Sequence, residues 1–103
     1  LFHEIRNYPQ ERFHFPCPDR SKDAAMEKIS QALEKWKGIK DVNKLDGIRV
    51  NFNDNSWILI RKSGTEPKIR AYCEGRSTKR LRQLVSKSSI IVRKAIRAAN
   101  QTK

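Results

Sequence analysis

The sequence predicts an α+β fold: a single domain in which two helices pack on one face of a mostly antiparallel sheet. Three observations lead to this prediction. The chain has 103 residues, 37% of them hydrophobic, which is enough for one compact core but not for two. Apolar residues recur at every second position in some segments and at every third or fourth position in others. These segments follow one another as strand, helix, three strands and helix, an order typical of helices that cover one face of a sheet.

The first strand is expected at residues 12–17, where Phe13 and Phe15 alternate with His14. Prolines bound this segment at positions 9, 16 and 18. Because proline cannot donate to the hydrogen-bond ladder, it is confined to the edges of sheets. The segment is therefore expected to be an edge strand.

Two helices are expected, one over residues 21–37 and one in the C-terminal quarter of the chain. Asp19 or Ser21 can cap the first helix, and Ser77 or Thr78 the second. Apolar residues at helical spacing define the buried stripe of each helix. In the first helix they are Ala25, Met26, Ile29, Leu33 and Trp36, and in the second Leu81, Leu84, Val85, Ile91, Val92, Ala95, Ile96 and Ala99.

Three further strands are expected between Asp46 and Glu74. Residues 48–52 alternate apolar with polar side chains, and residues 57–60 are apolar after an Asn-Asp-Asn turn. Residues 68–74 place apolar and polar side chains on opposite faces of a third strand. The sheet is thus expected to have one buried face and one polar face.

The chain carries a formal charge of +12 and has a pI near 10.2, which favours anionic partners. No acidic residue follows Glu74, so the C-terminal segment is strongly cationic. Such a run is either a solvated helix face or a nucleic-acid surface. The second alternative gains from three aromatic residues of the expected strands that could stack on bases, Phe52, Trp57 and Tyr72.

Several other functional classes find no support in the sequence. Cys17 and Cys73 are not at zinc or disulfide spacing, and both are interpreted as small buried hydrophobes. His3 and His14 have no partner at ligand spacing, so no metal site is expected. No apolar run approaches the roughly 20 residues that a membrane-spanning helix needs, and no signal peptide opens the chain. A cytoplasmic protein without membrane partners is expected.

Residues 61–70, Arg-Lys-Ser-Gly-Thr-Glu-Pro-Lys-Ile-Arg, join two of the expected strands through a loop rich in groups that bind phosphate. Arg61 and Arg70 each offer a planar guanidinium that can hold two phosphate oxygens. Ser63 and Thr65 add hydroxyl donors. Gly64 leaves room for a phosphate to reach the backbone, and because glycine tolerates positive φ, we expect the neighbouring amides to converge there. The loop is therefore expected to bind an anion without a metal.

Three other residues of this loop have supporting parts. Pro67 restricts its own φ and the conformation of Glu66, so the loop is expected to be rigid. Glu66 would repel phosphate unless it turns outward or pairs with a basic neighbour, and we expect it to brace the loop. Lys68 is given only a supporting electrostatic part.

The string R-K-S-G-T-E-P-K-I-R, preceded by D-G-I-R-V-N-F and S-W-I-L-I and followed by A-Y-C-E, resembles the C-terminal domain of the α-D-phosphohexomutase superfamily. The resemblance covers nearly the whole chain and is strongest to phosphoglucosamine and phosphomannose mutases. It implies a TATA-binding-protein-like fold. It also implies that the loop grips the non-reacting phosphate of a hexose phosphate through Arg61, Ser63, Gly64, Thr65 and Arg70.

This resemblance further implies a four-domain enzyme that moves a phosphoryl group between positions 1 and 6 of a hexose, with a phosphoserine and Mg²⁺. The family's phosphoserine loop, D-G-D-x-D-R metal loop and G-E-x-S-G sugar loop have no counterpart here. The isolated domain is therefore expected to be inactive, with no catalytic residue or cofactor of its own. Residues 1–10 are expected to link it to a preceding domain and residues 11–103 to form the phosphate-binding domain.

Two alternatives remain open beside this interpretation. The chain could be a basic nucleic-acid-binding module, as its charge suggests, although it contains no RNA-binding motif. It could also be a docking domain, whose basic helix meets an acidic neighbour and whose loop is an ordinary turn, because Ser, Gly and Thr favour turns for local reasons.

Overall fold

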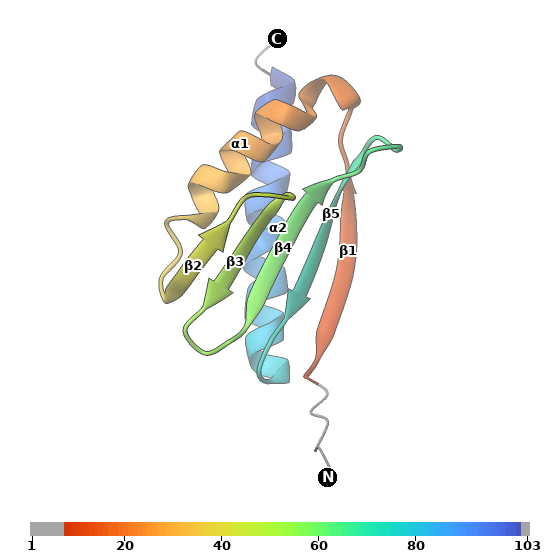
Figure 1. The fold of residues 1–103 in the computed structure, drawn as a ribbon. Helices are drawn as coiled ribbons and strands as arrows, with labels where there is room; N and C mark the ends of the chain where they lie inside the picture. Colours follow the sequence, from red (N-terminus) through yellow and green to blue (C-terminus); the bar gives the residue numbers. More distant parts are fainter. Residues whose placement is uncertain (1–7, 102–103) are drawn as a thin grey trace.

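A computed structural model describes residues 8–101, which form five strands and two α-helices (Figure 1). The elements follow in the order β1 (Gln10–Pro16), a 3₁₀ turn η1 (Asp19–Ser21), α1 (Lys22–Leu33), β2 (Ile39–Asn43), β3 (Ile48–Phe52), β4 (Trp57–Lys62), β5 (Lys68–Glu74) and α2 (Thr78–Gln101). The predicted α+β class is confirmed. Residues 1–7, which contain His3 and most of the expected linker, lie outside the described part of the chain.

The five strands form one sheet in the order β1-β5-β4-β3-β2, and every pair of neighbours is antiparallel. β1 lies at one edge, as its flanking prolines predict, although it begins two residues earlier and ends one residue earlier than expected. The three central strands follow one another in sequence as two hairpins. The second of these hairpins carries the loop that the sequence singles out.

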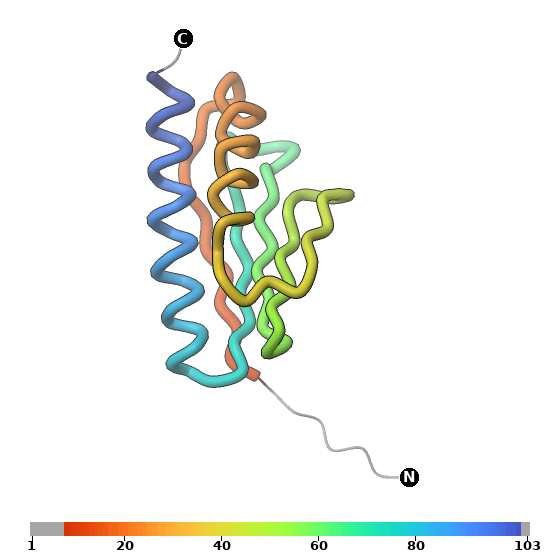
Figure 2. The backbone as a smooth tube through the Cα atoms, turned by 90° about the vertical axis from the view of Figure 1, so that its left-hand side faces the viewer, coloured from red at the N-terminus to blue at the C-terminus, as the bar shows by residue number. Residues whose placement is uncertain are grey.

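One face of the sheet is buried and the other is open, because side chains alternate along each strand. Ile58 and Ile60 of β4 and Ile69, Ala71 and Cys73 of β5 are all at most 1% exposed. Both helices pack on this buried face, and seen from the side α2 lies on one side of the strands (Figure 2). The predicted two-layer arrangement is therefore confirmed.

Helix α1 is shorter than the expected span and begins without a side-chain cap. It ends at Leu33, and Trp36 instead lies in the following turn, where its ring packs 5.2 Å from that of Phe52. Neither Asp19 nor Ser21 caps the helix. The Asp19 carboxylate pairs with a lysine side chain, and the Ser21 hydroxyl donates to Asn100 Oδ1 at 2.5 Å. Both residues that the local pattern assigned to capping thus contact other side chains instead, Asp19 a local one and Ser21 one remote in sequence.

β2 is absent from the sequence-based expectation, which assigned no element between Gly38 and Asp46. It is a short edge strand with a register shift between Ile39 and Asp41, so its apolar residues Ile39 and Val42 are three apart instead of two. The irregularity removes the alternation by which strands are recognised. In contrast, the predicted cap of the second helix is confirmed, since Ser77 Oγ accepts a hydrogen bond from Arg80 N–H at 3.0 Å.

The two cysteines are buried and unpaired, each 1% exposed, as their interpretation as small hydrophobes predicts. Cys17 follows β1, and Cys73 belongs to β5, where its side chain faces Ser88 of α2. Within residues 8–101, no helix is both long enough and apolar enough to cross a membrane.

Candidate functional site

The candidate site is the loop that joins β4 to β5. Arg61 on β4 lies directly opposite Arg70 on β5, so both side chains leave the open face of the sheet next to each other. The hairpin closes through a hydrogen bond from Ser63 N–H to the Lys68 carbonyl at 2.9 Å. The structure therefore brings the two predicted arginines together at the base of one short loop.

Ser63 is the buried member of the loop, 7% exposed. Its hydroxyl oxygen accepts hydrogen bonds from Glu66 N–H at 3.1 Å and from Thr65 N–H at 3.3 Å. These two bonds form a tight turn of the kind that serine side chains promote. The hydroxyl oxygen thus organises the loop. Thr65 itself is exposed.

Gly64 lies at the exposed tip of the loop. Gly64 does not use the positive φ that glycine tolerates, since the glycines with positive φ among the described residues are Gly38 and Gly47. A Cβ atom added to Gly64 would meet nothing within 4 Å. The protein itself thus leaves the space beside Gly64 open.

Both arginines are paired with carboxylates in the free protein. Arg61 Nη2 lies 3.4 Å from Asp46 Oδ2, and Arg70 Nη2 lies 3.1 Å from Glu66 Oε1. Glu66 Oε1 also lies 3.1 Å from Lys68 Nζ. Each guanidinium has five N–H donors, so one such contact leaves further donors for an anion.

Glu66 pairs with basic neighbours, as predicted for a residue that braces the loop. The hydrogen bond from Lys68 and its positive charge, followed by the charges of Arg70 and His14, lower the pKa of the Glu66 carboxyl below its usual value. This carboxylate is therefore ionised at neutral pH and neutralises part of the charge that flanks the loop.

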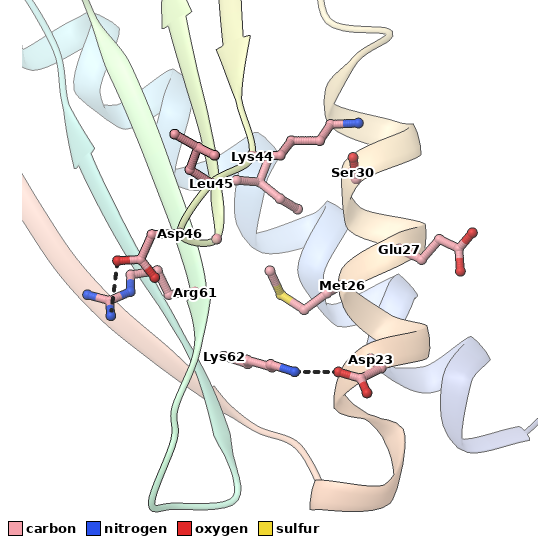
Figure 3. Close-up of a pocket in the computed structure, with 11 residues that line it drawn as sticks. Asp23, Met26, Glu27, Ser30, Lys44, Leu45, Asp46, Arg61 and Lys62 are labelled. Atoms are coloured by element: carbon pink, nitrogen blue, oxygen red, sulfur yellow. Dashed lines mark hydrogen bonds and ion pairs between the residues drawn. The ribbon is translucent and has the colours of Figure 1, made fainter.

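Two cavities open beside the loop, one next to each arginine. Arg61 borders a cavity of about 460 Å³ between α1 and the strands, where Lys62 also forms an ion pair with Asp23 at 2.5 Å (Figure 3). Arg70 borders a smaller cavity of about 150 Å³ on the open face, together with Arg12, His14 and Tyr72. The loop tip lies outside both cavities, so an anion there would contact the loop's backbone from solvent.

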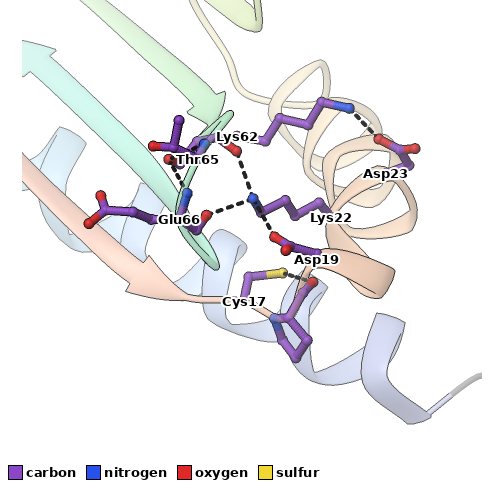
Figure 4. Close-up of polar contacts among 9 residues, drawn as sticks. Cys17, Asp19, Lys22, Asp23, Lys62, Thr65 and Glu66 are labelled. Carbon is purple, nitrogen blue, oxygen red and sulfur yellow. Dashed lines mark hydrogen bonds and ion pairs between the residues drawn. The ribbon is translucent and has the colours of Figure 1, made fainter.

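The sequence does not indicate the residue that fixes the loop from the side of α1. Lys22, the first residue of α1, donates from Nζ to the carbonyl oxygens of Ser63 and Glu66, each at 2.6 Å (Figure 4). The loop also receives a backbone bond on this side, from Cys17 N–H to the Pro67 carbonyl at 2.8 Å. A lysine at a helix start is usually solvated, and its position 41 residues before Ser63 gives no local signal.

The open face also bears on the nucleic-acid alternative. Phe52 is 1% exposed and lies on the buried face under the helices, so the idea that it stacks on bases is wrong. Trp57 and Tyr72 do lie on the open face, where both are half-buried and the Arg49 guanidinium covers the Trp57 ring at 4.3 Å. The stacking surface is therefore smaller than the sequence suggested.

Fold and loop together define a small α+β domain that carries a cationic hairpin loop at one end of its sheet. The chain matches the family model for the C-terminal domain of phosphoglucomutase/phosphomannomutase over residues 14–88. It belongs to this family of phosphosugar mutases. The matched region contains the whole of the loop and both arginines.

Individual relatives agree with this assignment. A probable phosphoglucosamine mutase of Methanothermobacter thermautotrophicus is 40% identical over 85 residues, which are 82% of this chain and 19% of that protein. A phosphopentomutase of Thermococcus kodakarensis is 35% identical over 103 residues, 98% of this chain and 23% of that protein. The chain thus spans about a fifth of the length of the curated relatives it matches.

The fold also matches that of a phosphoglucomutase/phosphomannomutase family protein from Burkholderia thailandensis, with a TM-score of 0.62. That match covers 94% of this chain and 19% of the other, at 24% sequence identity. At this identity the likeness supports the fold alone.

Proposed function

We propose that this chain is the phosphate-binding domain of a phosphohexomutase and that its β4–β5 loop grips the non-reacting phosphate of a hexose phosphate. Residues 11–103 form this domain and residues 1–10 connect it to a preceding domain of the same chain. The observation that carries the proposal is the pair Arg61 and Arg70. Their side chains project next to each other from the open face of the sheet, at the base of the loop whose exposed tip is Gly64. Two guanidinium groups and a bare backbone are the donors that a phosphate dianion requires.

A phosphate grip also accounts for the range of sugars in the relatives' names. The chain is similar to proteins named for glucosamine and for a pentose, two sugars of different size. A domain that recognises the phosphate common to these substrates can serve both. Holding this phosphate fixes the sugar, and fixed geometry lowers a phosphoryl-transfer barrier by several kcal/mol.

Chemistry would reside in the preceding domains. The described residues contain no group of three or more His, Cys, Asp or Glu side chains that could hold a metal ion. By its resemblance to the phosphohexomutases, the phosphoserine and the Mg²⁺ used for phosphoryl transfer are assigned to the other domains of the full-length enzyme, together with the choice of hexose. The isolated chain should bind a hexose phosphate weakly and should not convert it. We also propose that the full-length enzyme is cytoplasmic.

The test is an NMR titration of the 103-residue chain with glucosamine 6-phosphate. The amides of Ser63, Gly64 and Thr65 should shift most. Arg61→Ala should weaken binding about tenfold or more, because a charge-assisted hydrogen bond contributes about 1.5 to 3 kcal/mol. The matched control is Arg82→Ala, which removes the same charge from an exposed position on α2.

Two outcomes would count against the proposal. One is the absence of any shift in the loop at high millimolar ligand. The other is an equal loss of affinity in both arginine variants, since net charge alone would then explain binding. Tight RNA binding with a steep dependence on salt would favour the nucleic-acid alternative instead.

A further inference from the structure

The ammonium group of Lys22 lies beneath the candidate loop, with only 9% of its side chain exposed. It contacts three oxygens: the carbonyls of Ser63 and Glu66 at 2.6 Å each, and Asp19 Oδ1 at 2.7 Å (Figure 4). An ammonium group has three N–H donors, so each donor here has an acceptor. Because a buried charge is costly unless it is paired, losing any of these three contacts would be unfavourable, and the position of the ammonium group is therefore well fixed.

The two carbonyls that Lys22 holds lie at opposite ends of the loop's turn. Ser63 begins the turn and Glu66 ends it, three residues later. One side chain therefore sets the distance between the two ends. Asp19, whose own side chain is 77% exposed, orients the ammonium group and offsets its charge. The link also ties the loop to the start of α1, an element remote in sequence.

Holding the Ser63 carbonyl has a consequence for the next amide. The described peptide bonds are all trans, and in a trans peptide the C=O and N–H point in opposite directions. The Ser63 carbonyl points at Lys22, so the Gly64 N–H of the same peptide points away from Lys22. This N–H has no hydrogen-bond partner among the described residues. It is a free donor at the loop tip, beside the open space that a side chain at Gly64 would occupy.

We propose that Lys22 is a positioning residue for phosphate binding: it holds the loop in its binding form before the ligand arrives and aims the Gly64 amide at the phosphate. This inference rests on the proposed function of the loop. Lys22 does not touch the phosphate in this scheme, since its three donors are already used. Its effect is to lower the conformational entropy that the loop loses when phosphate binds.

The experiment compares Lys22→Met with Lys28→Met in the 103-residue chain. Methionine keeps most of the aliphatic stem of Lys22 and removes its donors. Lys28 lies on the same helix and has no ion pair among the described residues, so its variant controls for the loss of one charge. Two quantities are measured by NMR: the order of the loop amides without ligand, from heteronuclear NOEs, and the affinity for inorganic phosphate.

Lys22→Met should lower the NOEs of Gly64, Thr65 and Glu66 and weaken phosphate binding about tenfold, because binding must then order the loop. Lys28→Met should change neither quantity. Unchanged loop order and unchanged affinity in Lys22→Met would overturn the inference while leaving the proposed function intact. Failure of the wild-type chain to bind at the loop would overturn both.

Asp19→Asn provides a second test, needed if Lys22→Met does not fold. This variant leaves Lys22 in place but removes the carboxylate that orients it. It also makes the chain more positive, so an effect of charge alone would strengthen phosphate binding. Positioning predicts the opposite sign, namely weaker binding and lower NOEs in the loop. Tighter binding by Asp19→Asn would show that Lys22 acts through its charge alone and would overturn the inference.

Discussion

Gly64 and Gly47 both lie near Arg61, but Gly47 is closely packed whereas Gly64 faces open space. A Cβ added at Gly47 would approach the Ile60 carbonyl oxygen to 2.5 Å and Arg61 Cγ to 2.7 Å, and its φ is +81°. A Cβ added at Gly64 would meet nothing within 4 Å. Glycine at position 47 is therefore required by the fold, whereas the fold places no such demand on Gly64.

This contrast leads to a prediction for two alanine variants. Gly64→Ala should keep the free energy of unfolding within about 0.5 kcal/mol of wild type, because it lies on the surface and touches nothing. It should weaken phosphate binding at the loop, because its methyl group occupies the space of the ligand. Gly47→Ala should destabilise the fold by about 2 kcal/mol or more through its left-handed backbone and close contacts. Urea unfolding and phosphate titration of both variants check this, and normal phosphate binding by Gly64→Ala would contradict it.

At the residue scale, the sequence indicates functional groups that lie close together along the chain, but not contacts between residues that are far apart in it. The functional groups of the loop could be named because they lie within ten consecutive positions and their chemistry is evident from residue type. Lys22 could not be found, because its partners are backbone carbonyls far along the chain, which no side-chain pattern marks. The left-handed conformation that Gly64 tolerates is not used, because the hydroxyl of Ser63 organises the turn.

At the scale of elements, the start of α2 shows how one side chain supports a helix. Ser77 Oγ accepts from Arg80 N–H at 3.0 Å, which satisfies one of the free amides at the helix start. Ser77→Ala should lower the free energy of unfolding by about 1 kcal/mol. Ser86→Ala, on the exposed side of the same helix, should leave it nearly unchanged. Equal effects of the two variants in urea unfolding would exclude a capping role.

Elements with regular apolar spacing were predicted well, and irregular ones were not. β3, β5 and helix α2 keep a constant apolar period over their length, and β4 contains a short apolar run after a turn, so their positions follow from the sequence pattern. β2 is interrupted by a register shift, which breaks the period within five residues. The end of α1 was placed too late because Trp36 is buried against Phe52 although the helix has ended. A buried position does not need to be helical to fit a helical spacing.

For the whole molecule, a buried thiol links stability to alkaline pH. Cys73 lies between the sheet and α2, and burial raises its pKa from the usual 9.0 to about 11. The folded chain therefore binds this proton more tightly than the unfolded chain does. The resulting stabilisation is fully present below pH 9 and is lost as the pH rises through about 11. A shift of this size corresponds to about 2 to 3 kcal/mol.

Urea unfolding between pH 8 and pH 10.5 measures this effect. The wild-type chain should lose stability over that interval, and Cys73→Ala should lose less. Cysteine and alanine differ in size, so the comparison concerns the slope with pH and not the absolute stability. An identical slope in both proteins would assign the alkaline loss to other groups.

The fold class followed from the order and periodicity of the segments, and the structure confirms it. What the order of segments could not give is the pairing of β1 with β5. Strands adjacent in sequence form hairpins by default, whereas β1 has the first helix and three strands between it and its neighbour. Only the two edge positions were open to a segment bounded by prolines, and the sequence does not distinguish between them.

The pairing of β1 with β5 also affects how the chain folds. Gln10 and Glu74, opposite each other at one end of this pair, are separated by 64 positions along the chain. The three hairpins between β2 and β5 close short loops, whereas pairing β1 with β5 costs the entropy of a long loop closure. Because Cys17 and Lys22 follow β1, the support beneath the β4–β5 loop forms with this late step. During folding we therefore expect the hairpin to bring its two arginines together before the contacts from Cys17 and Lys22 hold the loop in place.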